Sequence, residues 1–346
     1  MSVTARPRGP RSSPVRADAT GAASAALRPV LEAPRRPARV LAAFPSAVYL
    51  EVRAELEPRV VAVTTGGAVR LPNALVTAGT PPPAAVGDEA WVGDGAVELE
   101  RLRLRVRRWW DPAPPPNRAG PARLAAALPV LAGVCDRSPR RPGLEGSDAA
   151  GLLAAGCARA SPLDCVTAAE RLVGLGPGLT PSGDDVLAGT LVALRHLGTA
   201  AGARRAVRLA DRLGAAVAFG ARGRTTAVSA TLLHCAARGQ ACAEVLAVLR
   251  GLTGGWPLEP ALERLLRLGH TSGADLAWGL RIGLAAVVAL AGEGTNGAAR
   301  AGDGANAAAR TRDRANGAAR VEDGANAAAR VEDGTNAAAR AGGRGE

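Results

Sequence analysis

The sequence contains no lysine, so all 43 of its basic residues are arginines. It has two phenylalanines, one tyrosine and one methionine in 346 residues, whereas alanine and glycine are abundant. This bias is typical of GC-rich coding, so the net charge of +12 is weak evidence for a nucleic-acid partner. Only Trp109 and Trp110 lie within an arginine-rich segment, which does not make a base-stacking surface. We therefore expect no nucleic-acid partner.

The five cysteines form no CxxC pair and no zinc-ligand spacing. An odd number of thiols without a secretion signal favours free cysteines in a reducing cytoplasm. The N-terminal segment has no continuous apolar run, which argues against a secretory signal. The most apolar run, residues 282–292, is too short to span a bilayer. We expect a cytoplasmic protein with no membrane partner.

The order of sequence patterns predicts an α+β protein in four segments. Residues 1–43 are rich in Pro, Arg, Ser and Ala and predict a disordered arm. Short β-branched or alternating runs in residues 44–118 predict a small antiparallel β domain. Apolar residues at three- and four-residue spacing across 119–292 predict a compact multi-helix domain. Residues 293–346 repeat a ten-residue unit without large apolar side chains, which predicts a disordered repeat tail.

One alternating run in the β region, VELERLRLRV, changes phase at Arg101. Val97 and Leu99 lie before this change, and Leu102 and Leu104 lie after it. The slip predicts either a β-bulge or a break between two strands.

The least ordinary segment is GLGPGLTPSGDD, residues 174–185, which runs into an apolar helix. Its glycines let the backbone turn tightly and bring N–H groups close to a ligand. The start of the following helix carries unpaired N–H donors and a partial positive charge, which suits an anion. The residues expected to bind a small anionic substrate in this segment are Gly176, Gly178, Thr180, Ser182 and Gly183.

The two acids that end this segment complicate an anion site, because carboxylates repel an anion. Ser182 is placed as an N-cap, and Asp185 resembles the acidic partner of a capping box. Asp184 could face a cation such as Mg²⁺ that itself binds phosphate, or either Asp could position an arginine. The competing interpretation is a glycine-rich turn with ordinary capping. We expect Asp184 to contact the ligand or a metal ion and Asp185 to be the helix cap.

A second segment, GRTTAVSATLL, places Arg224, Thr225 and Thr226 at a helix start. An arginine with neighbouring hydroxyls suits a phosphate or carboxylate, and Thr225 and Thr226 are the expected anion-binding residues. The alternative is an N-cap beside a solvated arginine.

A third segment, GHTSGADLAWG, places His270, Thr271 and Ser272 at another helix start. Thr271 and Ser272 are expected to bind the anion, and Asp275 has the spacing of a helix cap from Ser272. His270 could equally be a structural histidine.

These three helix starts are expected to converge. A buried donor or hydroxyl without a partner costs about 1–3 kcal/mol, and a shared polar pocket would satisfy several of them together. Asp184, Arg224 and His270 are the expected catalytic residues. The residues predicted to line one cavity are Thr180, Ser182, Asp184, Arg224, Thr225, His270 and Ser272.

The same segments carry a family resemblance. GLGPGLTPSGDDVLAG, GRTTAVSATLL and GHTSGADLAWG, preceded by FPSAVYL, RLPNALVT and RRWWDP, resemble the AllH-type subunits of oxamate carbamoyltransferase. The resemblance extends over about residues 44–292. The S-T-R-T signature of ordinary carbamoyltransferases is absent.

The resemblance implies a role in allantoin or purine nitrogen catabolism. It implies a multi-subunit enzyme that converts oxalurate and phosphate into oxamate and carbamoyl phosphate, with FdrA-like and AllG-like partner subunits. The alternative is a non-catalytic subunit that binds a small anion or nucleotide and docks on an acyl-CoA-synthetase-like partner. No cofactor is identified by the sequence, although Mg²⁺ is possible.

Overall fold

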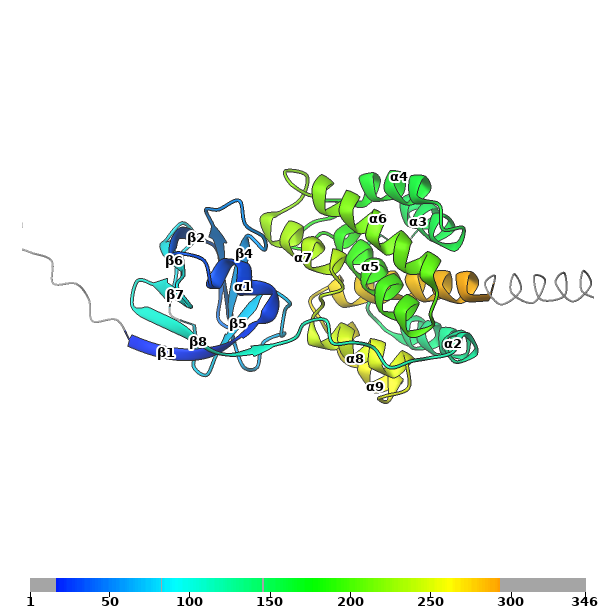
Figure 1. Cartoon of the computed structure of the whole chain (residues 1–346), viewed down its shortest axis with the longest axis horizontal. Helices are drawn as coiled ribbons and strands as arrows, with labels where there is room; N and C mark the ends of the chain where they lie inside the picture. Colours follow the sequence, from blue (N-terminus) through cyan, green and yellow to red (C-terminus); the bar gives the residue numbers. More distant parts are fainter. Residues whose placement is uncertain (1–16, 82, 145, 293–346) are drawn as a thin grey trace, which may run out of the picture. The chain divides into compact units, whose positions relative to one another are not determined.

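Eight strands between Ala17 and Trp110 close into a β-barrel in the computed structural model (Figure 1). The structure describes residues 17–81, 83–144 and 146–292. The strands are β1 (Ala17–Ser24), β2 (Arg36–Phe44), β3 (Ala47–Val52), β4 (Val60–Thr65), β5 (Ala74–Thr77), β6 (Glu89–Gly93), β7 (Ala96–Leu99) and β8 (Leu102–Trp110). Their order around the barrel is β1-β5-β4-β3-β2-β6-β7-β8.

The barrel is a mixed sheet. β1 runs parallel to β8, and β4 runs parallel to β5, whereas the other neighbouring strands are antiparallel. Leu50, Leu75 and Leu104 are fully buried inside it. A 3₁₀ turn (Ala25–Leu27) and the short helix α1 (Arg28–Leu31) add further apolar side chains. The interior is therefore packed with the protein's own side chains.

The predicted small antiparallel β domain after a disordered arm is wrong, although the α+β class holds. Residues 17–43, assigned to the arm, form β1, α1 and most of β2, and β1 closes the barrel by pairing with β5 and β8. The small residues of β1 are what this position requires, because a Cβ at Gly21 would lie 2.5 Å from the carbonyl oxygen of Val76. The rest of the predicted arm, residues 1–16, and the predicted tail, 293–346, lie outside the described residues.

The phase change at Arg101 marks a break between two strands. β7 ends at Leu99 and β8 begins at Leu102, and the two strands pair antiparallel across the turn between them. This alternative of the prediction is confirmed.

Strand β4 is buried on both of its faces. Val61 and Val63 point into the barrel core. Because side chains alternate across a strand, Val60, Ala62 and Thr64 face outward, and yet all three are buried. The backbone N–H of Val60 donates to the Thr231 hydroxyl at 3.2 Å, so this outward face packs against the helices.

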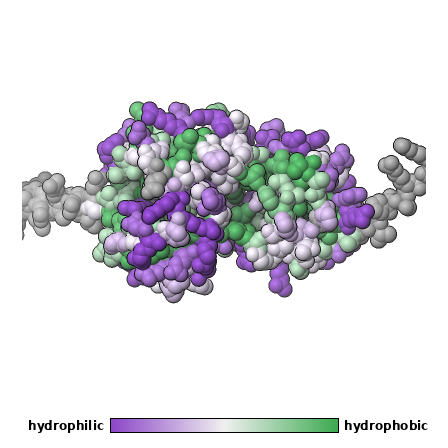
Figure 2. Space-filling model, turned by 180° about the vertical axis from the view of Figure 1, so that it is seen from behind, coloured by the Kyte–Doolittle hydropathy of each residue, from purple (hydrophilic) through white to green (hydrophobic). Residues whose placement is uncertain are grey.

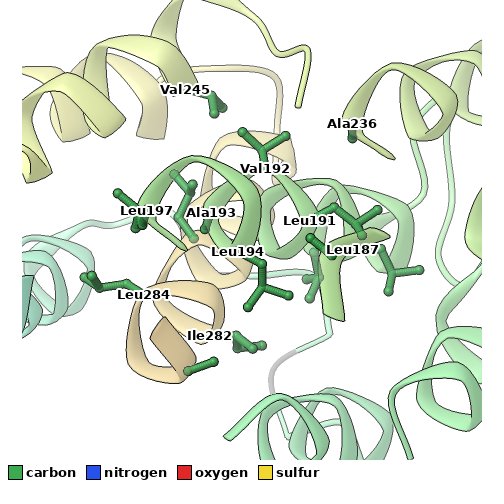
Figure 3. Close-up of a cluster of buried hydrophobic side chains, with 14 of the residues drawn as sticks. Leu187, Leu191, Val192, Ala193, Leu194, Leu197, Ala236, Val245, Ile282 and Leu284 are labelled. Carbon is green, nitrogen blue, oxygen red and sulfur yellow. The ribbon is translucent and has the colours of Figure 1, made fainter. Parts of the chain in front are cut away.

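The second half of the described chain is a helical bundle. It comprises α2 (Pro121–Arg137), α3 (Asp148–Ala158), α4 (Pro162–Leu172), α5 (Ser182–Ala200), α6 (Arg204–Gly220), α7 (Ala227–Ala237), α8 (Ala243–Leu252), α9 (Leu258–Leu266) and the helix Ser272–Gly292. The central element is α5, which is buried along most of its length. Figure 3 shows Val192 on the side of α5 toward Val245, and Leu194 on the side toward Ile282.

The helix Ser272–Gly292 is long and apolar enough, by length and composition, to cross a membrane. It has 21 residues and a mean hydropathy of 1.6, so the sequence argument that this run was too short does not hold. About two thirds of its apolar window, 67%, is buried inside the structure, and packing against the bundle gives that apolar surface a partner.

Glycines allow α5 and the helix Ser272–Gly292 to cross at close range. A Cβ at Gly189 would lie 2.4 Å from the carbonyl oxygen of Leu276, and a Cβ at Gly279 would lie 2.2 Å from that of Val186. The Thr190 hydroxyl bridges the crossing by donating to the carbonyls of Val186 and Gly279 at 2.9 and 3.2 Å. This crossing brings the starts of both helices together.

Replacing Gly279 by alanine is expected to destabilise the protein by about 1–3 kcal/mol, because the new methyl group overlaps backbone that cannot move independently. Urea unfolding followed by circular dichroism measures the change. Gly220→Ala, at the end of α6 with open space around its Cβ, is the control and should leave the midpoint unchanged or slightly higher. Equal midpoints for Gly279→Ala and wild type would contradict the close crossing.

Candidate functional site

The loop before α5 depends on its glycines. Gly174, Gly176 and Gly178 have φ values of 76°, 114° and 96°, a region that residues with a Cβ rarely adopt. A Cβ at Gly183, in the first turn of α5, would lie 2.0 Å from the carbonyl oxygen of Leu172. The four glycines therefore fold the loop tightly against the end of α4.

The predicted capping box at the start of α5 does not form. The N-cap residue is Pro181, and the first turn has no side-chain cap. Ser182 is the first helical residue, and its hydroxyl lies 3.4 Å from that of Thr271. Asp185 therefore does not cap α5.

Asp184 is a buried acid that joins two segments of the bundle through hydrogen bonds. Its side chain accepts hydrogen bonds from the N–H of Gly174 at 2.9 Å, from the Ser229 hydroxyl at 2.6 Å and from the Thr225 hydroxyl. The residue is 1% exposed and joins the glycine loop to the start of α7. The structure therefore gives Asp184 protein partners in place of the expected ligand or Mg²⁺. No group of three or more potential metal-ligating side chains occurs within residues 17–81, 83–144 and 146–292.

Asp185, the next residue, lines a cavity. It is 7% exposed, and its Oδ2 has no hydrogen-bond partner among the described residues. Burial raises the pKa of its carboxyl to about 8, and the nearby Asp275 adds to this, whereas the hydroxyls of Ser272 and Thr180 lower it. At neutral pH the carboxyl is therefore mainly protonated.

The starts of α5 and of the helix Ser272–Gly292 meet through hydroxyls. The Thr180 and Ser272 hydroxyl oxygens lie 3.0 Å apart. Asp275 is fully buried, and its Oδ1 accepts from the N–H of Gly143 at 2.8 Å. Burial raises the pKa of Asp275, although the hydroxyls of Ser182 and Thr271 and the Gly143 N–H lower it. Asp275 thus ties a distant loop to this helix start.

The remaining predicted residues serve other contacts. Arg224 is exposed and donates to the carbonyl oxygen of Glu170. Thr226 is the N-cap of α7, accepting from the Ser229 N–H at 3.0 Å. His270 is exposed at the turn before the last helix. Neither Arg224 nor His270 lines the cavity.

A cavity of about 580 Å³ lies between the barrel and the helical bundle. Its polar lining side chains are Ser46, Tyr49, Thr64, Thr180, Asp185, Gln240 and Ser272. The rest of the cavity wall is mainly apolar. On the face of the molecule drawn in Figure 2, hydrophobic residues reach the surface near the middle of the molecule. Sequence reasoning missed the barrel side. The unbroken apolar run VVAV at the start of β4 could have indicated that both faces of this strand are buried.

The three helix starts do converge, but most of the residues predicted to line a shared cavity do not line it. Hydrogen bonds connect all three segments, but of the seven residues predicted to line one cavity, only Thr180 and Ser272 do so. Ser182, Asp184 and Thr225 form the hydrogen-bonded layer behind it.

No arginine or histidine is among the described residues that line this cavity. A second pocket of about 230 Å³ is lined by Arg140, Arg141 and Arg281, together with Asp136 and Trp278. Arg140 also donates to the carbonyl oxygens of Arg267 and Gly269, beside the turn that leads into Ser272. The main cavity therefore offers hydrogen bonds but no positive side chain to an anion.

Residues 172–284 match the model of the family described as oxamate carbamoyltransferase subunit AllH. This confirms the resemblance for that part of the chain. The matched residues include all three helix starts and the cavity-lining residues Thr180, Asp185 and Ser272. The barrel lies outside the match. The AllH match is thus narrower than the extent of about 44–292 expected from the sequence. No solved structure matches the chain.

Proposed function

We propose that this chain is a subunit of an oxamate-carbamoyltransferase-like enzyme and that it holds the carbamoyl group of the substrate at Asp185. The matched segment, residues 172–284, supplies Thr180, Asp185 and Ser272 to the cavity, and this supports the proposal. In this role the chain would act with FdrA-like and AllG-like subunits.

The place of Asp185 in the cavity wall, with an Oδ2 that has no partner among the described residues, is the observation that carries the proposal. Burial raises the pKa of this carboxyl to about 8, which favours its protonated form at neutral pH. A neutral carboxyl donates one hydrogen bond and accepts another, and a carbamoyl group offers a carbonyl acceptor beside an N–H donor. Oδ2 of Asp185 has no partner among the described residues, so a ligand can take this hydrogen bond without displacing a protein contact. The hydroxyls of Thr180 and Ser272 lie beside the same carboxyl.

The chemistry follows from this pairing. In the proposed reaction a phosphate oxygen attacks the carbamoyl carbon, the bond from that carbon to the oxamate nitrogen breaks, and this nitrogen gains the proton that phosphate loses. Asp185 would donate to the carbamoyl oxygen while negative charge develops on it. Since no arginine lines the cavity among the described residues, the cations that hold phosphate would come from a partner subunit.

Replacing Asp185 by alanine is expected to lower kcat by about 100-fold or more, the usual effect of losing one donor to a developing oxyanion. The assay measures carbamoyl phosphate formed from oxalurate and phosphate by this chain with its FdrA-like and AllG-like subunits. Asp185→Asn keeps a donor and an acceptor and should retain more activity. Arg224→Ala is the control and should match wild type, because Arg224 lies outside the cavity.

The non-catalytic alternative predicts a different result for the same variants. If the chain only binds a ligand for its partner, Asp185→Ala weakens binding but leaves kcat unchanged at saturating substrate. A complex of folded subunits that forms no carbamoyl phosphate under any condition would overturn the carbamoyltransferase proposal.

A further inference from the structure

The second pocket, of about 230 Å³, is separate from the main cavity and shares no lining residue with it. Its wall comes from the end of α2, the loop that follows α2, the end of α9 and the helix Ser272–Gly292. On that last helix, Ala274, Trp278 and Arg281 are spaced by four and three residues, so they lie on one face of it. The last helix therefore turns different residues toward the two pockets.

The second pocket is positively charged. Arg140, Arg141 and Arg281 line it, and Asp136 is the single acid among its described lining residues. Arg141 and Arg281 are exposed, and within the described part of the chain neither forms an ion pair or a side-chain hydrogen bond. Their guanidinium groups are therefore free to bind an anion without breaking a contact inside the protein.

The loop that carries two of these arginines is held in place. The Arg140 side chain donates to the carbonyl oxygen of Arg267 at 3.0 Å, and the N–H of Gly143 donates to the carboxyl of Asp275 at 2.8 Å. Both bonds tie the loop to the turn and helix on the far side of the pocket. Because the loop is already ordered, binding an anion here costs little additional conformational entropy.

The rest of the pocket wall is largely apolar. Trp278 lies beside Pro142, Leu266 and Ala274 in the lining. A volume of about 230 Å³ is below the range of roughly 300–1,000 Å³ that is usual for drug-sized ligands. The pocket is therefore suited to a small ligand that combines a charged group with a short organic part.

We propose that this pocket binds a small organic phosphate. Its phosphoryl group would lie among the guanidinium groups of Arg140, Arg141 and Arg281, and its short substituent would lie against Trp278 and Leu266. A phosphate monoester carries up to two negative charges and three strong acceptor oxygens, which suits three arginines better than a carboxylate does. This inference does not depend on the proposed function, since it concerns a different pocket.

Isothermal titration calorimetry on the full chain tests the ligand class with inorganic phosphate, propyl phosphate, acetate and AMP. Propyl phosphate is expected to bind several-fold more tightly than inorganic phosphate, because its propyl group covers apolar wall. Acetate, with one charge and two oxygens, should bind about tenfold more weakly than inorganic phosphate or worse. AMP exceeds the pocket and should gain nothing over inorganic phosphate.

Variants of Arg281 locate the site. Arg281→Gln is expected to weaken phosphate binding by about tenfold or more, because a hydrogen-bonded charge is lost. Arg281→Lys keeps the charge without the planar fork and should fall between the two. Arg212→Gln removes the same charge from an exposed position on α6 outside the pocket and should bind phosphate as wild type does.

Trp278 supplies an independent readout. Binding of propyl phosphate should change the tryptophan fluorescence of the wild type, and this change should vanish in Trp278→Phe. Calorimetry on Trp278→Phe should still detect inorganic phosphate with near wild-type affinity, which shows that the variant is folded. A fluorescence change that survives in Trp278→Phe would contradict this location.

The remaining outcomes each decide one part of the inference. Equal losses in Arg281→Gln and Arg212→Gln would show general attraction to a basic chain and overturn the site. Tighter binding of AMP than of propyl phosphate would overturn the small-ligand class. Phosphate binding that is lost in Asp185→Ala but kept in Arg281→Gln would move the phosphate to the main cavity. A folded complex that forms no carbamoyl phosphate would remove the proposed function and leave binding at the second pocket unchanged.

Discussion

Asp184→Ala is expected to destabilise the protein by about 4 kcal/mol, because three donors lose their shared acceptor. The Gly174 N–H and the hydroxyls of Thr225 and Ser229 would remain in a largely buried position, at about 1–3 kcal/mol for each unpaired group. The effect would appear as a lower urea midpoint by circular dichroism.

The control for Asp184 is Asp211→Ala. Asp211 is an exposed acid of α6 whose ion pair with Arg195 lies at the surface, where such pairs contribute about 1 kcal/mol or less. Asp184→Asn keeps one acceptor oxygen and should fall between wild type and the alanine variant. A wild-type midpoint for Asp184→Ala would show that the network is not structural and would restore Asp184 as a candidate ligand contact.

Asp185→Asn is expected to make the protein more stable than wild type at pH 8 and about equal to it near pH 4. In the folded protein Asp185 holds its proton up to about pH 8, whereas in the unfolded chain it loses the proton near its ordinary pKa of 3.8. The folded state therefore binds more protons between these two values, and wild-type stability falls as pH rises through this window. At 1.36 kcal/mol per pKa unit, the loss reaches up to about 5 kcal/mol.

Urea unfolding of wild type and Asp185→Asn at several pH values between 4 and 8 measures this difference. Some slope should remain in the variant, because burial also raises the pKa of Asp275. Asp164→Asn is the control, and its stability difference from wild type should stay nearly constant across this pH range. Hydrogen bonds from Arg159 and Ser161 lower the Asp164 pKa, so its contribution is present above pH 4 and is lost on acidification. Parallel pH profiles for wild type and Asp185→Asn would contradict the protonated carboxyl.

Asp184 and Asp185 are adjacent acids with opposite effects on stability. Asp184 stabilises the fold as an acceptor for its neighbours, whereas Asp185 lowers stability at neutral pH. A residue that costs stability where it stands is expected at a functional site, since selection for stability alone would replace it. The stability measurements therefore bear on the site as well as on the fold.

The sequence by itself determined the features that depend on local pattern. Helical periodicity across 119–292, the strand break at Arg101 and the glycine requirement of the loop at 174–178 all follow from spacing and backbone conformation. Convergence of the three helix starts could also be expected from their shared hydroxyls. The hydrogen bond between Thr180 and Ser272 joins two of them, and that between Asp184 and Thr225 joins the third.

Only the tertiary structure decided which of two neighbouring carboxyls reaches the cavity. Successive residues on a helix point about 100° apart, so Asp184 and Asp185 had to face different surroundings, and the packing of α7 and of the helix Ser272–Gly292 assigned them. The barrel likewise depends on pairing between β1 and β8, as between Ala17 and Leu102, which lie 85 residues apart and which no local pattern brings together. Because Ser46, Tyr49 and Thr64 line the cavity only where the barrel meets the helices, their place in its wall could be seen only in the folded protein.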